Sequence, residues 1–369
     1  VHARGAHGSA TAGAHLVSRL GDERAHVAEH AIDALSGVVA QAAALERLVR
    51  HCAEGGFPGM LAARTLERWA AASPDAVEHA VTVGLASERD PAARAHLEEL
   101  AQDLRSGARD ATKPPTRGGP GLTVAQLFLH GDLDGSLRHS GQGDTGGVAT
   151  LLVPLGDALR HGARVDRVIT ISGSRDAAVA DAWAAGATTG RTLSQDLAPR
   201  GHHYARIPLS GPSTSVSTAW SLRIQARHGI REVLRAAGRV DVIHLRMADV
   251  GSLVAAEVAA ELGIPVVLTL APDPQALLAA READGSLTRA EFGDADRVEH
   301  LWFRNRLLRA LAAQAEHLVL FPRPDVERSI GRLVGIDVTA RRERVSVVGE
   351  GIDLAALERV AKEVAGDAP

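Results

Sequence analysis

The hydrophobic pattern divides the chain into two parts with different periodicity. Over residues 1–106 the apolar positions follow helical spacing, and Ser73-Pro74 and Asp90-Pro91 are typical of helix N-termini. Over residues 121–348 short apolar runs alternate with longer amphipathic segments. Such runs are typical of a parallel sheet covered on both faces. The pattern therefore predicts an all-α domain followed by an α/β domain with a Rossmann-like parallel sheet.

The α/β part contains strands and helices in alternation. The candidate strands are Thr123–Leu129, Arg167–Ser172, His203–Ile207, Val240–Leu245, Pro265–Leu270, Leu318–Phe321 and Val345–Val348. The candidate helices are Gly147–His161, Ala219–Ala236, Val250–Glu261, Gln275–Ala283, Arg297–Gln314 and Pro324–Leu333. In sheets of this type ligands bind at the carboxyl ends of the strands.

The helical part shows weak internal similarity with a period of roughly 33 residues. The segments Gly21–Ala31 and Asp90–Arg94 resemble HEAT-type repeats, which would offer a surface to a protein partner. An ordinary helical bundle is the alternative. Residues 107–120 contain Lys113-Pro114-Pro115 and almost no apolar side chains, which predicts an extended or mobile linker between the two domains.

Composition narrows the function classes. The net charge of −4 gives no general attraction to nucleic acid or to an anionic membrane. Cys52 is the only cysteine, which excludes an internal disulfide and fits a reducing, cytoplasmic compartment. No apolar run approaches the roughly 20 residues that cross a bilayer, so we expect no membrane span.

The clearest chemical signal is a glycine-rich loop between the first strand and the next helix. It begins with His130-Gly131-Asp132-Leu133-Asp134-Gly135 and ends with Gly141-Gln142-Gly143-Asp144-Thr145-Gly146-Gly147. A loop of this kind presents bare backbone N–H groups at a helix N-terminus, which suits phosphate. Its glycine spacing also fits a dinucleotide fingerprint, although that fingerprint should follow its strand at once. Arg175, at the end of the second strand, keeps an NADP enzyme as an alternative.

Other stretches join this loop in a family resemblance. They are Asp241–Gly251, Gly263–Thr269 and Arg344–Asp353. Taken in order, these pieces resemble the N-terminal half of a family-4 retaining glycosyltransferase of GT-B fold, from the sucrose-phosphate synthase and sucrose synthase group. The resemblance implies hexose transfer with retention from a nucleotide sugar, expected to be UDP-linked, to a small carbohydrate acceptor such as a sugar phosphate. It implies no cofactor and no metal ion.

The resemblance also implies roles for particular residues. Its catalytic residues here are His244, Arg246 and Asp249. Its donor- and acceptor-binding residues are His130, Gly131, Asp134, Gly135, Asp144, Thr145, Gly146, Gly147 and Thr269. On the residues alone, His244 can equally be a structural histidine, Asp134 a loop cap and Thr269 a packing residue.

Two departures from the family pattern open an alternative. Arg246 replaces a histidine, and a guanidinium stays protonated where an imidazole can be neutral. Ala271 stands near a position where the group often has histidine. Arg246 could bind phosphate instead, or the domain could be a degenerate scaffold whose helical repeats bind a protein. Since residues 349–369 resemble only the start of the crossing to a donor-binding domain, we expect a fragment that is inactive alone.

Two histidine pairs and an arginine run have plain interpretations. His26 and His30 could share a metal but fit a solvated helix face. His202-His203 fits a polar loop before a strand. The run Arg297, Arg304, Arg306 and Arg309 fits either a solvated face or a basic lining toward an acceptor phosphate.

Overall fold

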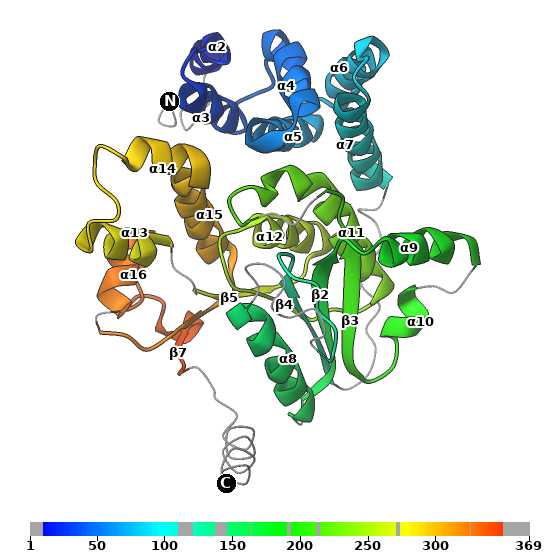
Figure 1. Cartoon of the computed structure of the whole chain (residues 1–369), viewed down its shortest axis with the longest axis vertical. Coiled ribbons are helices and arrows are strands. Elements are labelled where there is room, and N and C mark those ends of the chain that lie inside the picture. The colour runs from blue at the N-terminus through cyan, green and yellow to red at the C-terminus, as the bar shows by residue number, and fades with distance from the viewer. Residues whose placement is uncertain are drawn as a thin grey trace, which may run out of the picture.

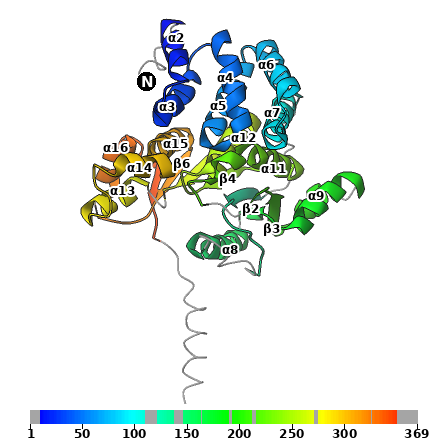
Figure 2. The ribbon, with the colours of Figure 1, turned by 45° about the horizontal axis from the view of Figure 1, so that its top comes forward.

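The computed structural model describes residues 10–109, 121–136, 146–162, 164–189, 193–211, 215–270, 274–324 and 326–349. These residues stack in layers, which Figure 2 shows nearly edge-on. Helix α8 lies below a parallel sheet, helices α11, α12 and α15 lie above it, and helices α2–α7 form an outer layer, called here the helical layer. Among the described helices, none combines the length and apolar character needed to cross a bilayer.

The sheet confirms the α/β class and the Rossmann-like parallel arrangement. Its strands are β1 (Leu122–Phe128), β2 (Val165–Ser174), β3 (Gly201–Pro208), β4 (Val242–Leu245), β5 (Val266–Thr269), β6 (His317–Leu320) and β7 (Val345–Val347). All are parallel, in the order β3-β2-β1-β4-β5-β6-β7. Each predicted strand is present within two residues at either end. From β1 the chain adds β2 and β3 on one side and then crosses back to add β4 to β7 on the other side. The gap between the ends of β1 and β4 is therefore the expected ligand crevice.

Helices connect these strands. They are α8 (Gly146–His161), α9 (Ala177–Thr189), α10 (Leu193–Leu197), the 3₁₀ turn η1 (Ala219–Leu222), α11 (Arg223–Ala236), α12 (Val250–Leu262), α13 (Pro274–Ala283), α14 (Phe292–Glu299), α15 (Leu301–Gln314) and α16 (Val326–Val334). Helix α12 is apolar almost throughout because it lies at the centre of the molecule (Figure 1). Asp249 caps its N-terminus, and Gly263 ends it in the left-handed conformation, at φ 66°.

The predicted helix Arg297–Gln314 is wrong as a single element. It breaks at His300, whose φ of 50° is left-handed, so that α14 and α15 meet there. The His300 ring stacks on Phe57 of the helical layer, with ring centroids 3.6 Å apart. The carboxylate of Asp296 also accepts a hydrogen bond from the N–H of Trp302 at 2.9 Å. Contacts between layers therefore hold a conformation that histidine rarely adopts.

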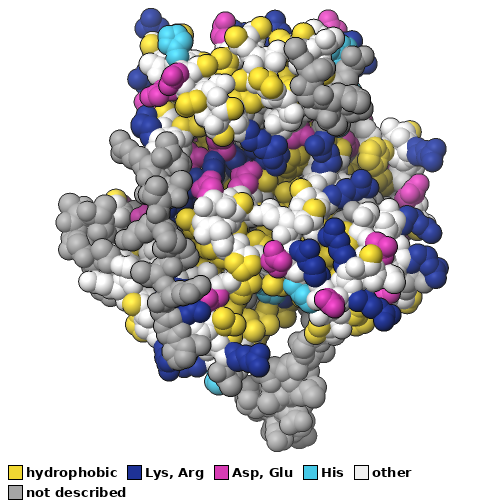
Figure 3. Space-filling model, turned by 180° about the vertical axis from the view of Figure 1, so that it is seen from behind, with side chains coloured by type: hydrophobic (Ala, Val, Ile, Leu, Met, Phe, Trp, Pro, Cys, Tyr) yellow, Lys and Arg dark blue, Asp and Glu magenta, His cyan; other side chains and the backbone are white. Residues whose placement is uncertain are grey.

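The helical layer consists of α2 (Ala10–Arg19), α3 (Ala25–Leu35), α4 (Ala42–Glu54), α5 (Gly56–Ala70), α6 (Pro74–Ser87) and α7 (Pro91–Arg109). A ladder of arginines on α11, here called the arginine ladder, joins it to the rest: Arg223, Arg227 and Arg231. Its acidic partners are Glu67 and Asp103 from the helical layer and Glu257 and Glu261 from α12. On the face drawn in Figure 3, acidic and basic side chains gather below the helical layer.

The arginine ladder is buried, so it differs from an ordinary surface network. Arg223 and Arg231 are each 1% exposed, and Asp103 is 3% exposed. Arg223 donates to Glu67 and Glu257, with both ion pairs at 2.6 Å. Since an unpaired charge at these positions would be very costly, the helical layer and α11 are held in one relative position.

Candidate functional site

The candidate site lies where β1 and β4 end side by side. These strands pair in parallel, with Val124 opposite Val242 and Gln126 opposite His244. The segments that follow them therefore leave the same edge of the sheet. They are Leu129–Ser136 after β1 and Arg246–Asp249 after β4.

The structure brings two of the predicted residues together at this edge. His130 Nε2 lies 3.0 Å from Asp249 Oδ2, and the two side chains are 4% and 3% exposed. Asp249 Oδ1 also accepts a hydrogen bond from the N–H of Ser252 at 2.8 Å. Burial raises the pKa of Asp249, but the hydrogen bonds from His130 and Ser252 and the charge of His130 outweigh burial and lower it. Asp249 is therefore an ionised carboxylate that fixes the imidazole of His130.

Arg304 of α15 is a buried cation close to this pair. It is 8% exposed, and Glu299 lies 3.9 Å away. Burial lowers the pKa of Arg304, while the charges of Glu299 and Asp249 act in the opposite direction. The predicted arginine run thus separates into different roles, because Arg306 pairs with Asp33 of the helical layer at 3.2 Å and Arg297 is exposed beside Asp294.

His244 and Thr269 form a second pair, apart from the first. His244 Nε2 and Thr269 Oγ1 are 2.7 Å apart on the neighbouring strands β4 and β5. His244 lies in register with Gln126, whose amide donates to Leu152 O of α8. Residues in register in parallel strands point to the same face, so His244 lies on the α8 face of the sheet. The helix that Asp249 caps lies on the opposite face (Figure 2).

The environment of His244 keeps its imidazole neutral. Burial and the nearby charge of Arg246 lower the pKa of His244 to about 4. Arg246 itself is 7% exposed at the end of β4. A neutral imidazole bonded to a threonine hydroxyl suits hydrogen bonding better than proton transfer near pH 7. Met247 packs in an apolar cluster with Phe128 and Leu152.

The loop after β1 is held by its own polar contacts. Asp132 accepts two hydrogen bonds from Arg206 of β3, each 2.5 Å long, and one from the Ser174 hydroxyl. Asp134 Oδ1 accepts hydrogen bonds from the N–H and hydroxyl of Ser136 at 3.1 and 3.0 Å. A Cβ on Gly135 would lie 3.1 Å from the ring of Tyr204, so a larger residue would displace that ring or the loop. Gly131 is buried beside His130.

The two glycines that begin α8 lie at the same edge. Helix α8 begins at Gly146, and Gly147 is exposed, where an added Cβ would meet no atom within 4 Å. Because the first N–H groups of a helix lack partners inside it, this end can receive an anion. Asp144 and Thr145 lie outside the described residues, as does Ala271.

Further along the edge, a broad hollow of about 1090 Å³ lies at the ends of β6 and β7 against α16. Its lining carries charges of both signs, from Arg323, Arg328, Glu327 and Asp337. Within the described part of the chain, no group of three or more histidine, cysteine or acidic side chains is arranged to hold a metal ion.

The prediction that His202-His203 lies in a loop before a strand is wrong, because both residues belong to β3. His202 is part of that strand, where its Nδ1 lies 2.7 Å from Asp157 of α8 and its Nε2 lies 2.7 Å from Thr170 of β2. Tyr204 OH is 3.2 Å from His202 Nδ1. Histidine and tyrosine two residues apart share one face of a strand, which was the available signal.

Comparisons with known proteins add a distant likeness of fold. No family model and no curated protein matches the chain. A UDP-GlcNAc 2-epimerase from Neisseria meningitidis, solved with UDP-GlcNAc, is 12% identical with a TM-score of 0.34, over 62% of this chain and 47% of that one. LpCGTa, solved in complex with UDP, is 14% identical with a TM-score of 0.36, over 63% of this chain and 55% of that one. The chain thus spans about half the length of these structures.

Proposed function

We propose that this chain is the acceptor-side part of a glycosyltransferase that moves a hexose from a nucleotide sugar to an acceptor hydroxyl. The observation that carries the proposal is the pair His130–Asp249, whose side chains are 3.0 Å apart. The pair lies between the ends of β1 and β4, where the order of the strands changes sides. That point is where doubly wound sheets bind nucleotides and related ligands. The resemblance of the loop and strand motifs to family-4 glycosyltransferases supports the same chemistry.

One requirement of glycosyl transfer is removal of a proton from the acceptor, and we assign this step to the pair. The ionised Asp249 accepts a hydrogen bond from Nε2–H of His130 and thereby leaves the Nδ1 lone pair as the proton acceptor. The carboxylate also stabilises the imidazolium that forms. In this proposal His130 is the general base, whereas His244 and Thr269 bond to each other on the opposite face of the sheet.

The second requirement is stabilisation of the negative charge on the departing diphosphate. The open first turn of α8, beginning at Gly146, and the cation Arg246 supply fixed positive potential near the same edge. We further propose that the nucleotide is UDP, that the acceptor is a sugar phosphate and that the transfer retains configuration. These three points rest on the family resemblance alone.

Titration of the chain with UDP-glucose tests the proposal, with isothermal calorimetry and thermal shift as readouts. We expect UDP-glucose to bind and to raise the melting temperature, and NADP to do neither. Gly147→Val should weaken UDP-glucose binding at least about tenfold, because the side chain enters the open space at the start of α8. Gly293→Val is the matched control, since Gly293 is also an open glycine in the first turn of a helix, α14.

Two results would count against a glycosyltransferase. If neither UDP-glucose nor other nucleotide sugars bind, a scaffold role becomes the better interpretation. If Gly147→Val binds UDP-glucose as the unchanged chain does, the donor does not contact the start of α8. Preferential binding of NADP would instead support the dinucleotide alternative.

A further inference from the structure

The first turn of α15 links the helical layer to the candidate site. It follows His300, which in the described part of the chain is the only residue other than glycine with a left-handed backbone, and it contains Arg304. Figure 1 draws α14 and α15 directly below the helical layer. Helix α12, which Asp249 caps, packs against α15. Contacts of the helical layer with this turn therefore act next to the candidate site.

The helical layer holds the turn through aromatic rings. The ring of His300 stacks on Phe57 of α5, with ring centroids 3.6 Å apart. The ring of Trp302 stacks on His30 of α3, with centroids 3.9 Å apart, and Phe303 meets Phe57 edge-on at 5.3 Å. A left-handed backbone is unfavourable for a residue that has a side chain. These contacts therefore offset the strain at His300.

The backbone of the turn carries this constraint to Arg304. The carbonyl of His300 accepts hydrogen bonds from the N–H groups of Phe303 and Arg304, each 3.0 Å long. The N–H of His300 donates to the carbonyl of Asp296 at 2.8 Å. The Arg304 backbone is thus bonded directly to the strained residue, so a change of conformation at His300 moves the guanidinium of Arg304.

Arg304 lies where Asp249 needs a counter-charge. The two residues are 8% and 2% exposed. Burial lowers the pKa of Arg304, and the charges of Glu299 and Asp249 oppose that effect. Glu299 has a closer cation in Arg281, at 2.7 Å, whereas Arg304 is 3.9 Å away. Because a buried carboxylate is costly without a positive charge nearby, Arg304 stabilises the ionised Asp249 that holds His130.

We propose that the helical layer positions the pair His130–Asp249 through this turn. His300 is the positioning residue, and it acts through Arg304. While Phe57 holds the left-handed corner, the cation stays beside Asp249 and the hydrogen bond of the pair stays closed. Release of the corner withdraws the cation and loosens that bond. The inference rests on the proposed function only for the role of the pair as general base.

The rate at which the Nε2–H proton of His130 exchanges with water tests the proposal. NMR of the full chain with 15N-labelled histidine follows this proton, and His130→Gln identifies its signal by removing it. Phe57→Leu removes the ring that offsets the strain at His300, and Arg304→Gln removes the cation. We expect each of these two variants to accelerate the exchange at least about tenfold, because each favours local opening of the hydrogen bond.

A second substitution separates positioning from packing. Glycine adopts the left-handed conformation without strain, so a chain with His300→Gly needs no stacking ring. Phe57→Leu combined with His300→Gly should therefore return the exchange rate to within about twofold of the rate in the unchanged chain. The same glycine should not rescue Arg304→Gln, because the cation is still missing.

Trp69→Leu is the matched control, since Trp69 is also a buried aromatic residue of α5. Its indole donates hydrogen bonds to the carbonyls of Leu35 and Val38, at the end of α3 and just after it. The substitution therefore weakens the helical layer without removing the ring that stacks on His300. Trp69→Leu should leave the exchange rate of the His130 proton unchanged.

Three outcomes would overturn the proposal. Absence of a slowly exchanging Nε2–H signal in the unchanged chain would show that the pair is not held. Equal acceleration by Trp69→Leu and Phe57→Leu would show that exchange follows overall stability. Failure of His300→Gly to rescue Phe57→Leu would show that the corner does not carry the effect. If UDP-glucose does not bind but the exchange rates change as expected, this inference stands and the proposed function alone fails.

Discussion

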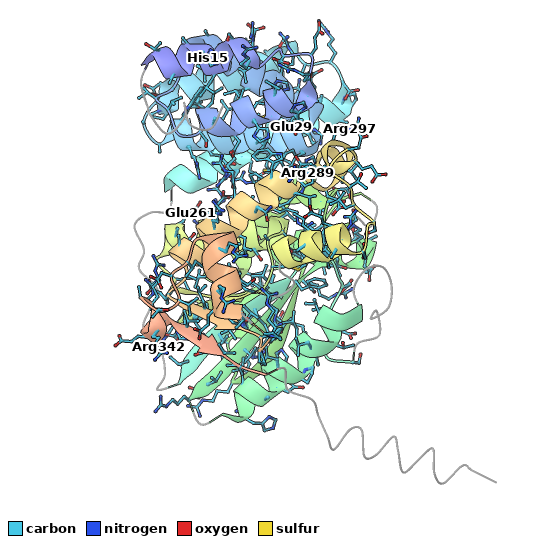
Figure 4. All side chains as sticks on the ribbon, turned by 90° about the vertical axis from the view of Figure 1, so that its left-hand side faces the viewer. His15, Glu29, Glu261, Arg289, Arg297 and Arg342 are labelled. Carbon is cyan, nitrogen blue, oxygen red and sulfur yellow. The ribbon has the colours of Figure 1, made fainter. Side chains whose placement is uncertain are left out.

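Glu29 shows how contact between the helical layer and α14 shifts the pKa of a single carboxyl group. It belongs to α3 and is 7% exposed, on the edge of the helical layer next to α14 (Figure 4). Burial and the negative charge of Asp296 raise the pKa of Glu29 to about 7. Burial also raises the pKa of Asp296. The boundary between α3 and α14 therefore favours a protonated carboxyl group, and ionisation of Glu29 opposes their contact.

We expect Glu29→Gln to stabilise the chain at pH 8 and to have little effect at pH 4.5. The folded pKa lies above the ordinary value of 4.5, so folding is favoured while Glu29 is protonated, and that stabilisation is lost as the pH rises through about 7. Glutamine keeps the neutral form at every pH. After allowance for partial exposure, the gain at pH 8 should be about 1–2 kcal/mol, measured by urea unfolding.

Glu23→Gln, at an exposed position before the same helix, should show no such dependence on pH. Burial lowers the pKa values of His30, His244 and His300 to about 4. The folded protein therefore loses stability as the pH falls and these histidines become protonated. These histidines are present in both the variant and the unchanged chain, so their effect cancels from the difference in unfolding free energy between the two. Equal stabilities of Glu29→Gln and the unchanged chain at pH 8 would contradict the prediction.

Motif reasoning identified site residues individually but not their pairing. His130 and Asp249 were both predicted for the site, yet they are 119 positions apart, and only the sheet order makes them neighbours. His244 was grouped with Asp249 because they are close in sequence, whereas strand alternation gives His244 a different partner, Thr269. Asp132 received no role because its partner Arg206 lies in a strand that joins the sheet two positions away from β1.

At the scale of elements, the strands could be predicted because their apolar runs are short and bounded by polar residues. Helix α9 (Ala177–Thr189) could not, since its alanine-rich sequence has little contrast between its faces. The break between α14 and α15 could not be predicted either, because histidine is no helix breaker and the stacking of His300 on Phe57 causes the break. Local sequence thus predicts elements well where packing between layers does not override it.

Two glycines on α8 allow a matched test of how closely that helix lies against the sheet. A Cβ on Gly156 would overlap the ring of His202 and lie 2.9 Å from Gln126 Nε2. A Cβ on Gly147 would meet no atom within 4 Å. We expect Gly156→Ala to lower the free energy of unfolding by about 1–3 kcal/mol, although alanine is the better helix former.

Gly147→Ala should change the same free energy by less than about 0.5 kcal/mol, because the exposed start of the helix can accept a methyl group. Chemical unfolding followed by circular dichroism measures both variants. If Gly156→Ala proved as stable as Gly147→Ala, α8 would be able to move away from Gln126 and His202 at no cost. The hydrogen bonds of that face would then be weaker than their distances suggest.

Buried charge joins the helical layer to the α/β part of the molecule. Most of the predicted linker, residues 110–120, lies outside the described residues. The arginine ladder crosses the boundary together with a cluster of aromatic rings: Phe57, Trp220, Trp302 and Phe303. The chain has only four tryptophans and five phenylalanines, so this concentration is marked. The spacing of the arginines on α11 was visible in the sequence, but their partners lie on α5, α7 and α12, more than 25 positions away.

The ladder makes a prediction about cooperativity. Arg231→Ala removes one of the two cations that hold Asp103, whose carboxylate is 2% exposed, and it also removes a partner of Glu261. We expect a loss of about 3–5 kcal/mol, because a buried charge is left without full compensation. Arg50→Ala breaks an exposed ion pair with Glu46 on α4 and should cost less than about 1 kcal/mol.

Urea unfolding of both variants, followed by far-UV circular dichroism and by tryptophan fluorescence, measures the two losses. If the ladder joins the layers into one cooperative unit, the two signals should change together in each variant, and only Arg231→Ala should shift the midpoint strongly. Equal shifts for the two variants would mean that the buried charges add no more than surface ones. Separate transitions in the unchanged chain would mean that the helical layer unfolds independently of the α/β part.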